Sequence, residues 1–262
     1  MRQSMLEHIT PVILTFNEEL NLGRVLDALT WARRVVVVDS DSSDRTEAIA
    51  RSYPNVDFRQ HPYKSHADKC NHALDQLLQG CPWVLYLDAD YIVTGELRDE
   101  MAALRPATTV SGFWVPFRYC IDGHALRGTL YPPRICLFRP ERGRFGQYGH
   151  TQLLELDGEV QRLQGRILHD DRKPSANFAA RQRRYAELEA AYLLQQDFGS
   201  LDWRKRLRRL LIIAPWAAPA FVLFGKGVIL DGVPGLKYAW ERAQAEWLIA
   251  TALWRQMLAA RQ

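Results

Sequence analysis

The stretch WVLYLDAD, residues 83–90, contains an unbroken apolar run that stops at two aspartates. Such a run is typical of a central strand that is covered on both faces of a parallel sheet. The run VVVVD, residues 35–39, has the same form. Because open α/β sheets bind ligands at the carboxyl ends of their strands, the two runs predict a binding site where they end.

Strand and helix patterns alternate around these two runs. Apolar runs predict strands at 9–14, 35–38, 56–59 and 83–90, and amphipathic stretches predict helices at 18–32, 45–52 and 66–78. This alternation predicts an α/β fold with a mostly parallel central sheet flanked by helices. Residues 111–156 are rich in aromatic side chains, Arg, Gly and Pro, which indicates short strands with long loops.

The chain divides into a sheet domain, residues 1–175, and a helical region, residues 176–262. We expect the sheet domain to have two halves, residues 1–105 and residues 106–175. A charged stretch predicts one long helix over 177–196. A closing amphipathic helix is predicted over 238–258, and we expect its stripe of Trp240, Trp247 and Trp254 to lie in a core.

Composition and charge exclude few function classes. The chain has 262 residues, 47% of them hydrophobic, a formal net charge of +4 and a pI near 8.9. A mildly basic balance suits anionic small molecules or lipid headgroups as well as nucleic acid. Four cysteines without paired spacing fit a reducing cytoplasm, and the N-terminus shows no signal-peptide core. We expect a cytoplasmic location and no nucleic-acid partner.

Asp88 and Asp90 are the strongest local signal in the sequence. Side chains two apart on a strand point to the same face, so the two carboxylates repel each other unless a cation or a proton lies between them. Mg²⁺ and Mn²⁺ bind carboxylate oxygens and keep positions open for diphosphate oxygens. The pair therefore favours a metal site, the alternative being a solvated turn after a strand.

Three further aspartates, Asp39, Asp41 and Asp44, follow the buried run at 35–38. Capping of the next helix explains Asp44 well. It explains Asp39 poorly, because a helix needs one cap and not a row of carboxylates. Asp39 is therefore predicted to hydrogen-bond a nucleotide base or ribose.

The ordered set PVILTFNEE, VVVVDSDSSDRT, a helix with Lys69 and Asn71, and WVLYLDAD resembles family 2 glycosyltransferases with the GT-A fold. These include lipopolysaccharide-core and exopolysaccharide glucosyltransferase-like proteins. The resemblance implies a Rossmann-like GT-A sheet and a site for a nucleotide-diphosphate sugar, with residues 1–105 as the donor half and residues 106–175 as the acceptor half. The donor-binding residues that it implies are Thr15, Asn17, Glu18, Asp39, Lys69 and Asp88.

Asp41 and Arg134 are further donor-binding candidates because of their positions in the sequence. Asp41 stands beside Asp39 after the strand. Arg127 and Arg134, in LRGTLYPPR, are suited to hold a diphosphate or an anionic acceptor through bidentate contacts, and equally to pin their loop. We count Arg134 with the donor site.

The resemblance also implies that a late histidine completes the metal or diphosphate site. We assign His169 as a third metal ligand beside Asp88 and Asp90. The expected cofactor is a divalent cation, Mn²⁺ or Mg²⁺, and an imidazole ligand favours Mn²⁺ modestly. The alternative for the segment HDDRK, residues 169–173, is a solvated charge run.

A catalytic base is harder to assign because the sequence departs from the family. Many lipopolysaccharide-core members carry DADE and a His-Glu pair, whereas Tyr91 and Gln152 stand at those places here. An inverting transfer needs a group that accepts the proton of the acceptor hydroxyl, and a glutamine cannot do this. The candidates are His150, for which a structural role is also open, Asp170 and Asp171.

A basic cluster precedes an apolar stretch in the helical region. The basic residues are Arg204, Lys205, Arg206, Arg208 and Arg209, and residues 210–224 carry no charge. That stretch is shorter than the about 20 residues of a spanning helix. We predict a monotopic segment at about 204–230 on the cytoplasmic face of the inner membrane, with Trp216 and Phe221 in lipid. The alternatives are a buried helix or an oligomer interface.

Together these features predict a metal-dependent, inverting hexosyltransferase. Its donor is a nucleotide-diphosphate sugar, and its acceptor is a membrane-associated glycan or lipid-linked molecule of lipopolysaccharide or exopolysaccharide biosynthesis. One alternative is a catalytically silent, sugar-nucleotide-binding membrane module. Another is a sugar nucleotidyltransferase, although FNEELNLGR, residues 16–24, is acidic where such enzymes carry a basic, Gly-rich loop. A homo-oligomer stays open.

Overall fold

The structure is a computed structural model that describes residues 4–148, 151–173 and 175–259. The chain forms two compact units. The first contains Met1–Cys120 and Tyr131–Arg172, and the second contains Ile121–Leu130 and Lys173–Gln262. The segment Ile121–Leu130, which we assigned to the sheet domain from the sequence, thus groups with the helical unit.

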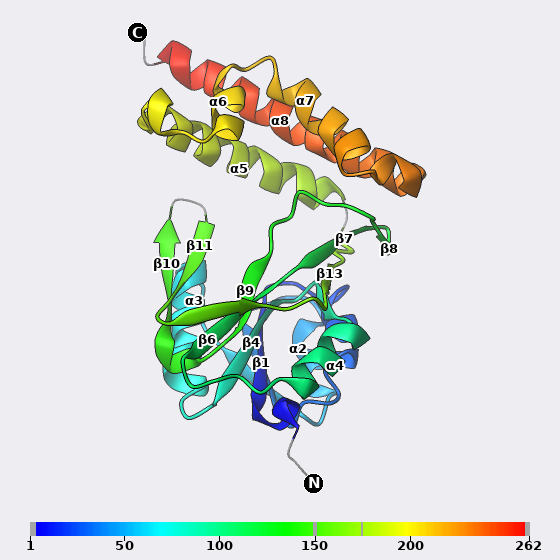
Figure 1. Cartoon of the computed structure of the whole chain (residues 1–262), viewed down its shortest axis with the longest axis vertical. Coiled ribbons are helices and arrows are strands. Elements are labelled where there is room, and N and C mark those ends of the chain that lie inside the picture. The colour runs from blue at the N-terminus through cyan, green and yellow to red at the C-terminus, as the bar shows by residue number, and fades with distance from the viewer. Residues whose placement is uncertain (1–3, 149–150, 174, 260–262) are drawn as a thin grey trace. The chain divides into compact units, whose positions relative to one another are not determined.

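A seven-stranded sheet forms the centre of the first unit (Figure 1). Its order is β12-β6-β9-β4-β1-β2-β3, in which β9 runs antiparallel to β4 and β6 while the other pairs are parallel. The predicted α/β fold with a mostly parallel central sheet is confirmed. The strands are β1 (Ile9–Thr15), β2 (Val35–Asp39), β3 (Val56–Gln60), β4 (Trp83–Asp88), β6 (Val110–Val115), β9 (Arg134–Phe138) and β12 (Glu159–Arg162).

Helices and smaller strands surround this sheet. Ser65 and Thr94 accept backbone hydrogen bonds at the starts of α3 and α4 and so fix where these helices begin. The helices are η1 (Met5–His8), α1 (Leu22–Asp27), α2 (Thr46–Arg51), α3 (His66–His72), the π-helical turn η2 (Ala73–Leu77), α4 (Gly95–Ala103) and η3 (Pro140–Arg142). The strands are β5 (Tyr91–Val93), β7 (Phe117–Ile121), β10 (Gly143–Tyr148), β11 (Thr151–Leu156) and β13 (Ile167–His169).

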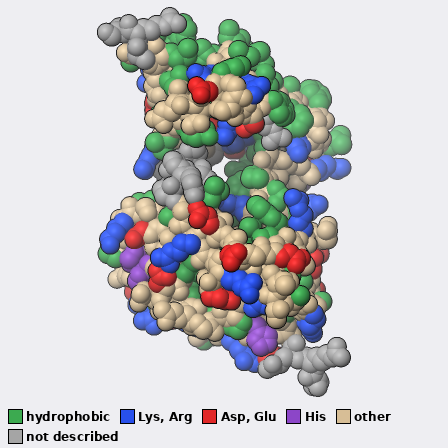
Figure 2. Space-filling view, turned by 60° about the vertical axis from the view of Figure 1, so that its left-hand side comes forward, with side chains coloured by type: hydrophobic (Ala, Val, Ile, Leu, Met, Phe, Trp, Pro, Cys, Tyr) green, Lys and Arg blue, Asp and Glu red, His purple; other side chains and the backbone are tan. Residues whose placement is uncertain are grey.

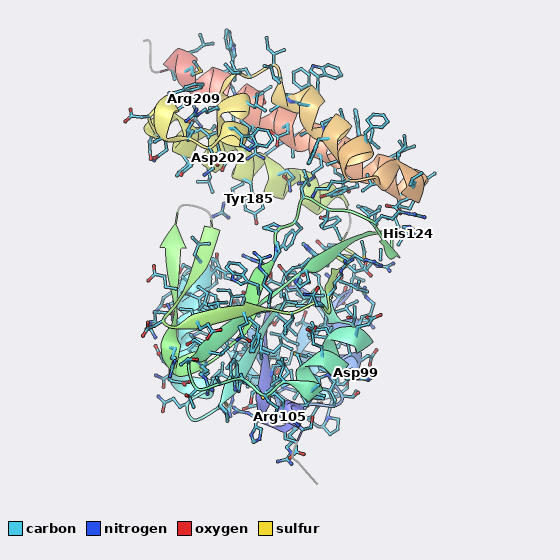
Figure 3. The ribbon with its side chains drawn as sticks, in the orientation of Figure 1. Asp99, Arg105, His124, Tyr185, Asp202 and Arg209 are labelled. Carbon is cyan, nitrogen blue, oxygen red and sulfur yellow. The ribbon has the colours of Figure 1, made fainter. Side chains whose placement is uncertain are left out.

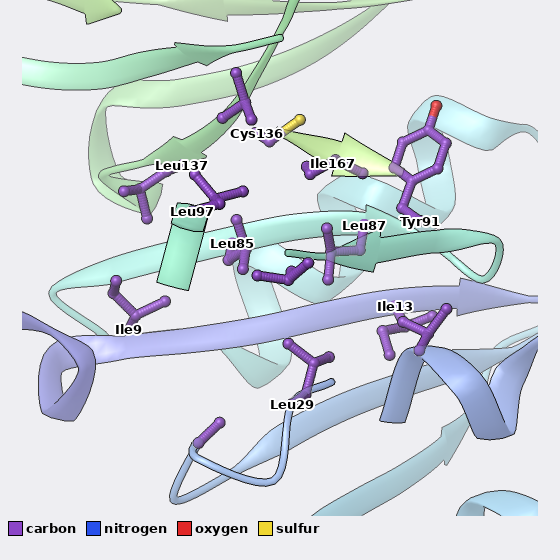
Figure 4. Packing of buried hydrophobic residues seen from close by; sticks show 14 of the residues in the cluster. Ile9, Ile13, Leu29, Leu85, Leu87, Tyr91, Leu97, Cys136, Leu137 and Ile167 are labelled. Carbon is purple, nitrogen blue, oxygen red and sulfur yellow. The ribbon is translucent and has the colours of Figure 1, made fainter. Parts of the chain in front are cut away.

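Apolar side chains cover both faces of the sheet. Ile13, Leu85 and Leu87 lie in one buried cluster, into which Leu97 of α4 also packs (Figure 4). Val12, Val36 and Val84 belong to a second cluster, which includes side chains of α3. Because successive side chains of a strand point to opposite faces, this double cover explains the continuous apolar runs in the sequence.

The second unit is helical (Figure 1). Ala190 and Leu193 of α5 and Leu253 of α8 are fully buried in its core. No helix in the described part of the chain is long and apolar enough to cross a membrane. The elements are the short strand β8 (His124–Ala125), α5 (Ser175–Gln195), η4 (Phe198–Ser200), α6 (Trp203–Arg209), α7 (Ala214–Ala220), η5 (Phe221–Gly225), η6 (Val228–Asp231) and α8 (Val233–Ala259).

The tryptophan stripe of α8 is on the surface of this unit. Trp240, Trp247 and Trp254 are 65%, 44% and 56% exposed, so our expectation that they lie in a core is wrong. The core of the unit is filled by small and branched side chains such as Ala252 and Leu253 on another face of α8. Figure 2 shows hydrophobic side chains spread over the surface of the helical unit.

The basic cluster of α6 is bonded largely within its own unit. It follows Asp202 and ends at Arg209 (Figure 3). Arg208 pairs with Glu246 at 2.6 Å and with Glu189 at 3.1 Å. Arg206 and Arg209 donate to the carbonyl oxygens of residues 201 and 196, both at 2.7 Å, and Lys205 lies 3.8 Å from Asp202. The side chain of Arg204 is outside the described part of the structure.

Candidate active site

The carboxyl ends of three neighbouring strands bring polar side chains together. The register pairs Thr15 of β1 with Asp39 of β2, and it pairs Leu14 of β1 with Asp88 of β4. Since these strands are parallel, Thr15, Asp39 and Asp88 lie along the same edge of the sheet. This is the edge where the sequence predicted a binding site.

Asp39 is buried and already hydrogen-bonded within the protein. Its carboxylate accepts from the Thr15 hydroxyl at 2.7 Å, and from the hydroxyl and backbone N–H of Ser42 at 2.6 and 2.8 Å. From the sequence we considered Asp39 free for a nucleotide. The structure shows instead that it also closes the turn after β2, and its nucleotide contact stays a prediction.

The loops after β1 and β2 are tied to each other. The backbone N–H of Asn17 donates to Ser42 at 2.8 Å, and the Asn17 side chain accepts from the N–H of Ser43 at 2.9 Å. The N–H of Glu18 donates to Thr46 at 2.8 Å. Asn17 and Asp41 have φ values of 52° and 55°, a left-handed conformation that short polar side chains tolerate. Asn17, Glu18 and Asp41, three of the predicted donor-binding residues, thus lie in one pair of loops that hydrogen-bond each other.

Lys69 of α3 is buried beneath these loops. Its Nζ atom donates to the carbonyl oxygen of Thr15 at 2.6 Å. Burial lowers the pKa of Lys69 to about 8, although the charges of Asp39, Glu18 and Asp88 oppose that shift. A buried ammonium group at the strand ends is therefore held among carboxylates, where a diphosphate would add to its stabilisation.

Asp88 lies in a network of hydrogen bonds and charges. Its Oδ1 atom accepts from the Tyr86 hydroxyl at 3.1 Å, and that hydroxyl is 2.6 Å from Nε2 of His66. Its Oδ2 atom is 3.9 Å from Nη1 of Arg134. Burial raises the pKa of Asp88, but the charges of His66 and Arg134 outweigh it, so the net shift is downward and the group is a carboxylate at neutral pH.

Asp90 and His169 form a second pair close by. Nε2 of His169 is 3.1 Å from Oδ2 of Asp90. Oδ1 of Asp90 and Nδ1 of His169 are buried and have no hydrogen-bond partner among the described residues. Burial lowers the pKa of His169, but Asp90 more than offsets it, so the net shift is upward. Carboxylate oxygen and imidazole nitrogen are both ligand types of divalent cations.

The predicted set of three metal ligands is assembled only in part. Within residues 4–148, 151–173 and 175–259, no group of three or more His, Cys, Asp or Glu side chains is placed to hold a metal ion. Asp90 and His169 are together, whereas Asp88 is bonded to Tyr86. The role of Asp88 as a ligand stays a prediction.

Asp170 and Asp171 are bound to the first helix. The buried Asp170 carboxylate pairs with Arg24 at 2.5 Å and with Arg172 at 3.0 Å. Asp171 accepts from the Asn21 side chain at 3.0 Å. These two ion pairs make Asp170 a structural anchor of the segment after β13. His150 lies outside the described residues.

Several aromatic residues at the site were not predicted. The ring of His169 lies 5.1, 4.9 and 4.8 Å from the rings of Tyr91, Tyr119 and Tyr131, each at a steep angle. Tyr86 could have been inferred, because a residue two positions before Asp88 shares its strand face. Tyr119 in β7 and Tyr131 in the loop before β9 are distant in sequence from His169 and gave no local signal.

A comparison with known families agrees with this geometry. The model of glycosyl transferase family 2 matches residues 10–152, more than half of the chain. The chain belongs to glycosyltransferase family 2. The matched region of this family 2 chain contains the polar residues at the ends of β1, β2 and β4, and it ends before His169 and the helices of the second unit.

Curated relatives match about half of this family 2 chain or less. It is 30% identical over 149 residues to lipopolysaccharide core biosynthesis glycosyltransferase LpsC of Rhizobium meliloti (strain 1021), covering 55% of this chain and 54% of that protein. It is 31% identical over 102 residues to uncharacterized glycosyltransferase RC0292 of Rickettsia conorii (strain ATCC VR-613 / Malish 7), covering 38% of this chain and 35% of that protein. The chain therefore spans about half the length of LpsC, and less of the second protein.

Solved structures are also similar to the family 2 chain at low identity. S. aureus TarS 1-349 in complex with UDP-GlcNAc has a TM-score of 0.48 and 16% identity, with 95% of this chain and 91% of that chain covered. Glucosyl-3-phosphoglycerate synthase from Mycobacterium tuberculosis, in complex with Mn²⁺, UDP and phosphoglyceric acid, has a TM-score of 0.44 and 15% identity, with 71% and 81% covered.

Proposed function

We propose that the chain transfers a hexose from a nucleotide-diphosphate sugar to a glycan or lipid-linked acceptor, with inversion at the sugar carbon. The observation that carries this proposal is the half-buried Asp90–His169 pair, in which each side chain has one buried atom without a hydrogen-bond partner among the described residues. The pair follows β4, which ends at Asp88, and Lys69 of α3 bonds Thr15 at the end of β1. Membership of family 2 and the match to LpsC support sugar transfer in lipopolysaccharide biosynthesis.

The donor would lie across the ends of β1, β2 and β4. Thr15, Asn17, Glu18, Asp39 and Asp41 would face the nucleoside, and the Lys69 ammonium group would support the charge of the diphosphate. Loops fixed by mutual hydrogen bonds favour such binding, because little conformational entropy is lost when the ligand binds.

We infer that Asp90 and His169 would hold a divalent cation, Mn²⁺ or Mg²⁺, with Asp88 as the further candidate, because carboxylate oxygen and imidazole nitrogen are ligand types that these ions accept. When bound, such an ion neutralises charge on the leaving diphosphate. The protein itself orients these ligands, because the Asp90 carboxylate and the His169 ring hold each other and three tyrosine rings surround the imidazole.

Inversion requires a base on the acceptor side. Because Asp170 is held by Arg24 and Arg172, we favour His150 and Asp171 as the residues to test for proton acceptance. The carboxylate of Asp171 lies beside Asn21 and follows His169 by two positions, which puts it close to the proposed cation ligands.

We further propose that the helical unit binds the cytoplasmic face of the inner membrane, where a lipid-linked acceptor would be. Exposed aromatic side chains of α7, η5 and α8 support this: Trp216, Phe221, Phe224, Trp240 and Trp247. Tryptophan favours the boundary between lipid and water. Because Arg206, Arg208 and Arg209 are bonded internally, we assign lipid contact mainly to the aromatic face and not to the basic cluster.

The test is turnover of a panel of nucleotide-diphosphate sugars with Mn²⁺ or with EDTA. We expect one donor to be consumed, and Asp90→Asn to lower its turnover by about 100-fold or more. Asp99→Asn, on the exposed face of α4 (Figure 3), is the matched control and should keep full activity. Full activity of the Asp90→Asn protein would refute the cation assignment. Donor binding without any turnover would favour the silent module, and release of pyrophosphate would favour a nucleotidyltransferase.

A further inference from the structure

A small pocket lies beside the proposed cation site in the first unit. Its volume is about 290 Å³, and its walls include the aromatic rings of Tyr86, Tyr91, Trp114 and Tyr131. Pockets for organic ligands are lined mainly by apolar and aromatic groups with a few placed polar groups, and about 300 Å³ is the lower end of their size range. The pocket therefore suits one ring and not an extended chain.

This pocket adjoins the reacting end of the site. The hydroxyl of Tyr86, a wall residue, donates to Asp88 at 3.1 Å. Another wall residue, Arg134, lies 3.9 Å from the same carboxylate. A ring bound here would present its hydroxyls next to the carboxylates at the end of β4.

Arg134 gives the pocket its charge. Among the described residues that line the pocket, it carries the only charged side chain. Its Nη1 atom donates to the hydroxyls of Tyr91 and Tyr131 at 3.1 and 3.2 Å, which fixes the plane of the guanidinium group. A guanidinium group held in one orientation binds a carboxylate or a phosphate through paired hydrogen bonds.

We propose that this pocket binds the acceptor's terminal sugar ring, and that the ring carries an anionic group, a carboxylate or a phosphate, which pairs with Arg134. This inference rests on the proposed sugar transfer. It assigns Arg134 to the acceptor, whereas its position in the sequence had suggested the donor diphosphate. Aromatic walls cover the apolar face of the ring, and Arg134 selects for charge.

The test uses calorimetric titration or saturation-transfer NMR with three simple probes on the full chain. Glucuronate carries a carboxylate, glucose 6-phosphate carries a phosphate, and methyl glucoside is neutral. We expect at least one anionic probe to bind about tenfold more tightly than the neutral one, and to bind equally well when UDP is present. The better of the two anionic probes identifies the group that Arg134 recognises.

Leu153 provides variants that leave Arg134 and the fold intact. It lines the pocket and is 51% exposed. Leu153→Glu should weaken binding of the anionic probe roughly fivefold, because like charges repel, and should leave binding of methyl glucoside unchanged. Leu153→Gln introduces a neutral side chain of the same shape as glutamate and is the control. It should change the binding of neither probe. Arg134→Met should abolish the preference for the anionic probe.

Two results would overturn the inference. One is equal binding of the neutral and anionic probes to the unaltered protein. The other is a pair of observations: UDP displaces the anionic probe, and Arg134→Met no longer binds UDP. Together they would show that Arg134 binds the donor and not the acceptor. The probe titrations need no donor, so failure of the proposed transfer, seen as no nucleotide-sugar binding or turnover, is a separate readout.

Discussion

A lysine inside a protein keeps its charge only as far as its surroundings replace the lost water. Lys69 is such a residue, buried next to Thr15 and among carboxylates, with a pKa of about 8. A group with a pKa near the working pH can change the affinity for an anionic ligand over a narrow pH range. The charge of Lys69 is therefore open to measurement.

We predict that UDP binding, measured with EDTA present, weakens as the pH rises from 7 to 9. The sign follows from the amine, which is protonated below its pKa of about 8 and loses its positive charge above it. The loss should approach about tenfold one unit above that pKa. Lys69→Met should bind UDP weakly at all these pH values. An unchanged pH profile in the variant would assign the effect to another group.

Single residues differ in how far the sequence predicts them. Asp88 and Asp90 were recognisable because an apolar run ends at them. The ion pair of Asp170 was not, because its partner Arg24 is 146 positions away in the chain. Asn71 was named as part of the family resemblance, without a predicted role. The structure shows that its side chain hydrogen-bonds the backbone of Phe145 at 2.9 and 3.0 Å. Local patterns predict such residues only when all partners are close in sequence.

The strands were predicted closely, and the helices less so. The run at 35–38 became β2 (Val35–Asp39), and the run at 83–90 became β4 (Trp83–Asp88). The helix predicted at 18–32 is only α1 (Leu22–Asp27), and residues 28–31 after it form turns. Before it, Glu18 and Asn21 bond each other, and Glu18 bonds Thr46. The helix predicted at 66–78 changes to a π-helical turn after His72. Where a helix meets a loop, side-chain hydrogen bonds thus outweigh the helical spacing of apolar residues.

A close approach between a loop and α4 gives a prediction at this scale. A Cβ atom on Gly165 would lie 2.4 Å from Cα and 2.7 Å from N of Leu97, which are backbone atoms that cannot move aside. We predict that Gly165→Ala lowers the free energy of unfolding by about 1–3 kcal/mol. Denaturant titration measures this change.

Gly95 in the same helix is the matched control. A Cβ atom there would meet nothing within 4 Å, so Gly95→Ala should change the free energy of unfolding by less than about 1 kcal/mol. Equal effects of the two substitutions would show that α4 can shift away from Gly165.

The apolar surface of the helical unit gives a prediction for the whole molecule. Phe224 and Trp240 are exposed. On the membrane proposal, Phe224→Asp and Trp240→Asp should each lower binding to vesicles of phosphatidylethanolamine and phosphatidylglycerol by about tenfold or more, since each substitution removes an aromatic ring that the proposal places in lipid. Co-sedimentation measures the bound fraction.

Salt and a control variant complete this experiment. Because much of the basic cluster is bonded internally, binding should weaken only modestly at high salt. Tyr63→Asp, at an exposed position of the first unit, should leave vesicle binding unchanged. Loss of binding in high salt, with no effect of Phe224→Asp, would contradict the aromatic assignment.

The helical unit is built from two separate parts of the chain. Within it, the N–H of Arg127 donates to Asp231 at 2.9 Å, and the N–H of Leu130 donates to Tyr238 at 3.0 Å, across 104 and 108 positions. During synthesis on a ribosome, Ile121–Leu130 therefore emerges long before its partners. The loop must stay unassembled until its partners in the second unit have been synthesised. A nascent chain arrested before residue 231 would present this loop without those partners, as a natural site for a chaperone or a protease.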